Sequence, residues 1–149
     1  MLSTLLVSLA SIAIARPLKA SCGGDAYEVR TLLASMNAAR RSKHLRPLML
    51  DRRLCRVAHD HALDMARRGY FGHTTPEGED AFDRMTASKC RFGYAGENLA
   101  IGLNARVIFH DFWESYEHRL NMLGGHYLRV GIASIESAVG TIVVEDFSD

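Results

Sequence analysis

Four segments between residues 70 and 133 hold most of the side chains that could do chemistry. They are residues 70–78 (YFGHTTPEG), 95–100 (AGENLA), 112–123 (FWESYEHRLNML) and 128–133 (LRVGIA). The first three supply imidazoles and carboxylates, which act as general acids and bases because histidine titrates near neutral pH. Neutral imidazole is also a common ligand of divalent metals. A site built from these segments could therefore transfer protons or hold a cation.

Other pairs of reactive residues are less well placed. His59 and His61 are two positions apart on an expected helix, so their side chains diverge by about 200° and cannot share a metal. His61 falls on the apolar face of that helix and is expected to be a hydrogen-bonded core histidine. Ser115 and His118 are close enough in sequence for a serine–histidine pair. However, the chain has no G-x-S-x-G motif that would place a nucleophilic serine.

The order and spacing of the four segments resemble the CAP superfamily, the secreted domain of cysteine-rich secretory proteins, insect-venom antigen 5 and plant pathogenesis-related proteins. The chain most resembles the bacterial single-domain branch, over roughly residues 27 to 147. Each segment alone is too short to be specific, so the specificity lies in their order. The resemblance implies an α+β fold, an α-β-α sandwich in which helices flank a small antiparallel sheet. It also implies one CAP domain over residues 21–149.

The resemblance further implies a cleft lined by two histidines and two acids. His73 matches the first histidine and Glu97 the first acid. His118 matches the second histidine, in agreement with its thirteen-residue spacing to Gly131. Ser115 occupies the position of the second acid, as is usual in the bacterial branch.

Glu114 is the nearest substitute for that second acid. It lies one helical turn before His118 and would share its face on a continuous helix. His73 and His118 could hold a divalent cation such as zinc, although weakly, because catalytic zinc normally takes three protein ligands. Glu97 is expected to orient a histidine or a water rather than bind the metal.

Three functions are compatible with these residues. The first is binding of a ligand or divalent cation in a cleft formed by His73, Glu97, Ser115 and His118, the ligand being a small molecule, a lipid or a peptide. The second is a hydrolase in which Glu97 orients a histidine base. The third is a structural or interaction module with a vestigial cleft. We favour binding, without the activity of a classical enzyme.

Regular elements must position these side chains, and the apolar pattern predicts where they lie. Helices are expected over residues 25–39, 51–68, 80–87 and 104–123, and strands over residues 48–50, 128–135 and 139–147. The last two strands are β-branched runs separated by a short turn and are expected to form a hairpin. Asp25, Asp51 and Asn104 are typical N-cap residues, and Gly69 is a typical C-cap residue. The segment that carries Glu97 shows little periodicity and is expected to be irregular.

Length and composition indicate a single globular domain, and the N-terminal residues indicate export. The 149 residues suffice for one buried core but not for two ordinary domains. Lys and Arg total 18 against 17 Asp and Glu, which gives no indication of nucleic-acid binding.

Residues 1–15 form an apolar run that ends in small residues, as in secretory signal peptides. We expect a signal peptide over about residues 1–20 and a secreted or periplasmic product with no integral membrane segment.

Three cysteines remain after such a cleavage: Cys22, Cys55 and Cys90. In an oxidising compartment, one disulfide and one free thiol are expected. The sequence does not determine which two cysteines pair. No C-x-x-C spacing is present, so a structural zinc site of the cysteine type is not expected.

Overall fold

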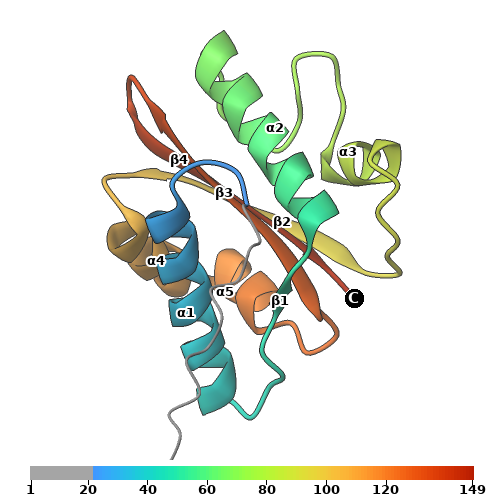
Figure 1. The fold of residues 1–149 in the computed structure, drawn as a ribbon, viewed down its shortest axis with the longest axis vertical. Coiled ribbons are helices and arrows are strands. Elements are labelled where there is room, and N and C mark those ends of the chain that lie inside the picture. The colour runs from blue at the N-terminus through green and yellow to red at the C-terminus, as the bar shows by residue number, and fades with distance from the viewer. Residues whose placement is uncertain (1–21) are drawn as a thin grey trace, which may run out of the picture.

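The computed structural model describes residues 22–149, which form five helices and a four-stranded sheet in three layers (Figure 1). The elements are α1 (Ala26–Ser42), β1 (Met49–Leu50), α2 (Arg52–Arg68), α3 (Ala81–Ala87), β2 (Ala95–Gly102), α4 (Ala105–Glu114), α5 (Tyr116–Leu123), β3 (Arg129–Ser137) and β4 (Gly140–Ser148). Helices α2 and α3 cover one side of the sheet, and α1, α4 and α5 cover the other. The predicted α-β-α sandwich is confirmed.

Two predictions concern export and membranes. The predicted signal peptide, about residues 1–20, lies outside the described residues. Within residues 22–149, no helix has both the length and the apolar character needed to cross a membrane.

The sheet has the strand order β1-β3-β4-β2. Strands β3 and β4 form the predicted hairpin, which closes where Ser137 faces Gly140. Strand β4 also pairs antiparallel with β2, from Ala95 opposite Ser148 to Gly102 opposite Thr141. The short strand β1 runs parallel to β3, so the sheet is mixed rather than wholly antiparallel.

Strand β2 is the main correction to the predicted elements. Glu97 was expected in an irregular segment, but it lies in an eight-residue strand. The alternation that signals a strand is missing because Glu97, Asn98 and Leu99 are all buried in succession. Helices cover both faces of the sheet, so consecutive residues of β2 are buried on opposite sides.

The predicted helix over residues 104–123 is also wrong, because the chain forms two helices there. The break is at Ser115, whose backbone is extended (φ −75°, ψ 123°). Apolar residues keep a helical spacing on both sides of the break, which is why periodicity did not reveal it. Consequently Glu114 and His118 belong to different helices. The one-turn relation that made Glu114 a candidate second acid does not exist.

Helix ends agree with the predicted caps. Asp25, Asp51 and Asn104 each accept backbone N–H groups of the first helical turn. Gly69 ends α2 in the left-handed conformation, with φ 69°. These caps act within one turn of chain, so the sequence alone specifies them.

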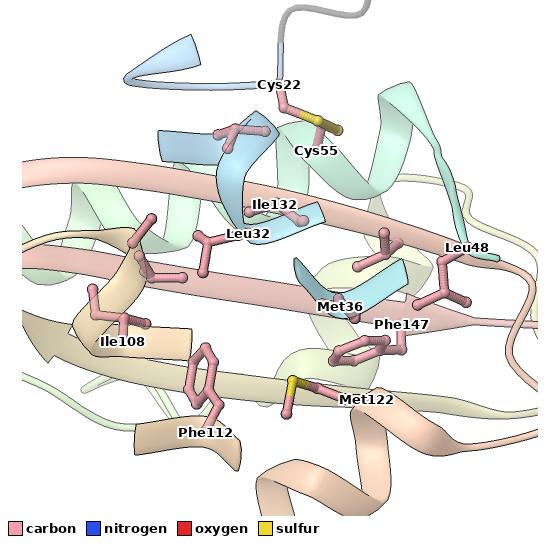
Figure 2. Packing of buried hydrophobic residues seen from close by; sticks show 14 of the residues in the cluster. Cys22, Leu32, Met36, Leu48, Cys55, Ile108, Phe112, Met122, Ile132 and Phe147 are labelled. Carbon is pink, nitrogen blue, oxygen red and sulfur yellow. A yellow bond between two sulfur atoms is a disulfide. The ribbon is translucent and has the colours of Figure 1, made fainter. Parts of the chain in front are cut away.

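The larger core lies between the sheet and helices α1 and α4, and is shown in Figure 2. Its fully buried side chains include Leu32, Met36, Ile108, Phe112 and Phe147. A disulfide joins Cys22 to Cys55 of α2, and Cys90 is free. The pairing that the sequence left open is thus Cys22–Cys55.

On the opposite face, α2 lies close against β3. A Cβ added at Gly131 would lie 2.1 Å from the carbonyl carbon of Leu54, so only glycine permits this approach. The small buried residues Ala58 and Ala62 extend the contact along α2 to Ala133. This packing fixes the helix that carries His61.

Candidate functional site

A buried carboxylate, Glu97, is at the centre of the candidate site. Its side chain is 3% exposed and comes from β2. One oxygen accepts a hydrogen bond from Nδ1 of His73 at 2.8 Å, and the other accepts from Nη2 of Arg84 at 2.7 Å. Arg84 comes from α3, whose start is fixed by a capping box between Asp80 and Asp83. The carboxylate therefore ties a loop and a helix to the sheet.

The same cluster holds both the side chain and the backbone of His73. Arg84 also donates from Nη1 to the backbone carbonyls of His73 and Glu79, both at 3.0 Å, which holds the loop against α3. The bond to Glu97 places a proton on Nδ1 of His73 and raises the pKa of its imidazole. The His73 side chain is 58% exposed. Its Nε2 is therefore the nitrogen available to a ligand from solvent.

His118 lies on α5, which is fastened to β2 by two amides. Asn98 donates to the His118 carbonyl oxygen at 3.2 Å, and Asn121 donates to the side-chain oxygen of Asn98 at 2.9 Å. The His118 ring packs against Phe112, with ring centroids 5.0 Å apart. Its Nδ1 is buried and has no partner among the described residues, which leaves Nε2 to meet a ligand.

The two imidazoles differ in their preferred charge. Burial lowers the pKa of His118, and the charge on His73 lowers it further. No hydrogen bond joins the two side chains in the described part of the chain. An imidazole with a raised pKa and one with a lowered pKa can pass a proton through a shared ligand or, when both are deprotonated, hold a cation.

The structure adds His61 as a supporting residue. As predicted, it is a hydrogen-bonded core histidine: Nε2 lies 3.0 Å from the carbonyl oxygen of Gly72 and 4.0 Å from Glu97. Burial lowers its pKa, so the ring is neutral and donates to Gly72. This bond anchors the residue that precedes His73.

Sequence reasoning missed Asp146, which pairs with Glu97 in register across β2 and β4. Asp146 is fully buried, and neither carboxyl oxygen has a hydrogen-bond donor among the described residues. Burial and the neighbouring negative charge of Glu97 raise the pKa of Asp146 well above its usual range. The raised pKa favours the neutral form of Asp146, which carries a proton that it can donate to a neighbouring acceptor.

Glu145, the neighbour of Asp146, lies on the opposite face of the sheet. It is fully buried and accepts a hydrogen bond from Asn98 at 3.1 Å. Burial raises the pKa of Glu145 to about 8. Polar residues around the site thus lie on both faces of the sheet. On the face that carries Glu145, Asn98 also donates to the carbonyl of His118.

The other two candidates lie apart from this network. Ser115 is half-buried at the break between α4 and α5, and its side chain does not cap α5. Glu114 is exposed. Within residues 22–149, neither forms a hydrogen bond to His73 or His118. No group of three or more His, Cys, Asp or Glu side chains in that range is arranged to hold a metal.

Comparisons with known proteins agree with this fold. A model of the cysteine-rich secretory protein family (CAP) matches residues 33–147. The chain is 32% identical over 124 residues to the uncharacterized protein YkwD of Bacillus subtilis, covering 83% of this chain and 47% of YkwD.

Two solved structures have similar folds. One is an extracellular protein containing an SCP domain from Bacillus anthracis, with TM-score 0.74 and 25% identity, over 80% of this chain and 39% of that one. The other is NaASP2 with Zn²⁺, with TM-score 0.58 and 14% identity, over 84% of this chain and 80% of that one. The chain spans less than half the length of the two bacterial relatives. Because the family model covers most of its length, this chain belongs to the cysteine-rich secretory protein (CAP) family.

Proposed function

We propose that this chain is an exported CAP-domain protein that binds a ligand between His73 and His118, and that a divalent cation such as zinc is one such ligand. The observation that carries the proposal is the contact of 2.8 Å between buried Glu97 and Nδ1 of half-exposed His73. A buried carboxylate on one ring nitrogen orients the other toward solvent. Arg84 supports this geometry through its contacts with Glu97 and with the His73 carbonyl.

The residues fit a weak metal site and not a closed one. His73 and His118 supply two imidazoles, and Glu97 is engaged with His73 and Arg84. Since residues 22–149 contain no group of three or more such ligands, water or a bound molecule would complete the coordination. When bound, the metal would supply a Lewis acid. Glu97 would keep Nδ1 of His73 protonated so that Nε2 is free to coordinate.

Two observations support export. The Cys22–Cys55 disulfide suits an oxidising compartment, because cytosolic thiols are normally kept reduced. The similar Bacillus anthracis protein is extracellular. We therefore assign the ligand to the space outside the cytoplasm, and its identity as a small molecule, lipid or peptide stays a prediction.

Calorimetric titration with zinc tests the proposal. We expect weak binding at about pH 7.5 and a marked loss at about pH 5.5, because protons compete for imidazole. A His73→Ala, His118→Ala double variant should not bind. His110→Ala is the matched control, because His110 is exposed on α4 and, within residues 22–149, its ion-pair partner is Asp111. Binding that persists in the double variant, or that is equally tight at both pH values, would show that the ligand site lies elsewhere.

A further inference from the structure

A second cluster of charged side chains surrounds the start of α2 and shares no residue with the His73–Glu97 site. It lines a cavity of about 250 Å³. The residues that carry the argument are Asp51, Arg52, Arg53, Cys90, Arg91 and Arg129. They come from α2, from the segment before β2 and from the start of β3. Nothing in the zinc-binding proposal uses them.

The arginines of this cavity outnumber the acids of its lining by four to one. In residues 22–149, the arginines that form ion pairs are Arg68 and Arg84, and neither lines the cavity. The one acid in the lining, Asp51, caps α2 by accepting the N–H groups of Arg53 and Leu54, and its charge offsets one arginine. Outside the lining, backbone hydrogen bonds lower the pKa of Asp149, and the charge of Arg129 lowers it further. Four arginines thus face one cavity in a chain whose formal net charge is only +1.

Two of the guanidinium groups are held in place by neutral acceptors. Arg53 donates from Nη1 to the carbonyl oxygen of Lys89 at 2.8 Å, and Arg129 donates from Nη2 to that of Arg91 at 3.1 Å. A carbonyl oxygen fixes the guanidinium without cancelling its charge. Each group keeps further N–H donors for a ligand, since a guanidinium has five. The site is therefore partly organised before any ligand arrives.

We propose that this cavity binds a phosphate group, either free or carried by a larger ligand. Guanidinium groups pair with phosphate through two parallel hydrogen bonds. A tetrahedral anion can accept bonds from several directions at once, whereas a planar carboxylate offers only two oxygens. Arginines from three separate segments suit the tetrahedral case. The cavity volume is slightly below roughly 300 Å³, the lower end of the range for small-molecule pockets. A cavity of this size suits a phosphate with few attached atoms.

The test is an NMR titration of the full chain with sodium phosphate and with glycerol phosphate, at constant ionic strength set by sodium chloride. We expect saturable shifts of the amide signals of Arg53, Cys90 and Arg129. An Arg52→Gln, Arg91→Gln double variant should weaken binding at least about tenfold, as expected for two lost charge-assisted contacts. These two side chains make no hydrogen bond within residues 22–149, so the fold should be unaffected. Preference for one of the two ligands would show whether the phosphate is free or esterified.

An Arg41→Gln, Arg106→Gln double variant is the matched control, because both arginines are exposed and lie on α1 and α4. It removes the same charge and should bind like the wild type. Equal weakening by both double variants would reduce the effect to net charge and overturn the proposal. Shifts that do not saturate, or equal binding of succinate, would also overturn it.

Discussion

Glu97→Ala should destabilise the protein as well as impair its site. The side chains of Glu97 and Arg84 are 3% and 10% exposed, and their atoms are 2.7 Å apart. Removing one partner of a buried ion pair costs about 3–5 kcal/mol when the other is left alone. Arg84 is not left alone, because it still donates to the carbonyls of His73 and Glu79. It is also close enough to Asp146 to lower its pKa, so Asp146 could partly replace the lost charge.

These compensations reduce the expected loss to about 2–3 kcal/mol. The bond to His73 adds less than about 1 kcal/mol, since that ring is mostly exposed. In urea, a total of about 3 kcal/mol corresponds to a midpoint shift of about 1.5 M at an m-value of about 2 kcal/mol/M.

Urea denaturation at neutral pH, followed by circular dichroism, measures the shift. Glu114→Ala is the control, because Glu114 is exposed and should change stability by less than about 0.5 kcal/mol. Small and equal shifts in the two variants would mean that the Glu97–Arg84 pair does not hold the loop and α3 to the sheet. The description of Glu97 as the centre of the site would then be wrong.

Three further predictions concern pH and the disulfide. Burial raises the pKa of Glu145 from 4.5 to about 8, so the folded state keeps a proton that the unfolded state releases. The free energy of unfolding should therefore fall as pH rises between these values. Glu145→Gln should make that pH dependence shallower in urea denaturation. The pKa of His73 is raised, so its stabilising contribution is complete below its ordinary value of 6.5 and is lost as pH rises through the raised value. His73→Ala should therefore destabilise more at about pH 6 than at about pH 9 in the same assay. The two cysteines of the Cys22–Cys55 disulfide are 33 positions apart in the sequence. A Cys22→Ser, Cys55→Ser double variant should therefore lose about 3.5 kcal/mol of unfolding free energy, measured by thermal denaturation. Cys90→Ser should change it little in the same assay.

The sequence was most informative where a few neighbouring residues determine the outcome. Asp51 and Gly69 delimit α2 through contacts within one helical turn, so their roles could be predicted. The position of His61 on the apolar face of α2 likewise predicted its burial. The hairpin of β3 and β4 followed from two β-branched runs separated by a short turn.

Tertiary contacts decided the elements that were predicted wrongly. Strand β2 is covered on both faces, so its burial pattern does not alternate and local signals fail. The break at Ser115 leaves the apolar spacing intact, and the helix beyond it, α5, is held to β2 through Asn98 and Asn121. Neither the burial of β2 nor the contacts of α5 can be derived from neighbouring residues in the sequence.

The candidate site shows the same division. Glu97 and His73 were identified as candidates through the family's motif, and the structure adds the contact between them. Arg84 and Asp146 had no motif to mark them. The role of Arg84 depends on α3 packing against the sheet, which brings it to Glu97, 13 positions further along the chain. The role of Asp146 depends on the β2–β4 register, which places it opposite Glu97.

Diffraction from a zinc-soaked crystal at about pH 7.5, with data collected at the zinc absorption edge, tests the central claim most directly. We predict one anomalous peak at about 2.1 Å from Nε2 of both His73 and His118, with water completing the coordination. Nδ1 of His73 should stay bonded to Glu97. A peak at another histidine, or none beside an ordered His73, would contradict the assignment of these two imidazoles as the ligand site.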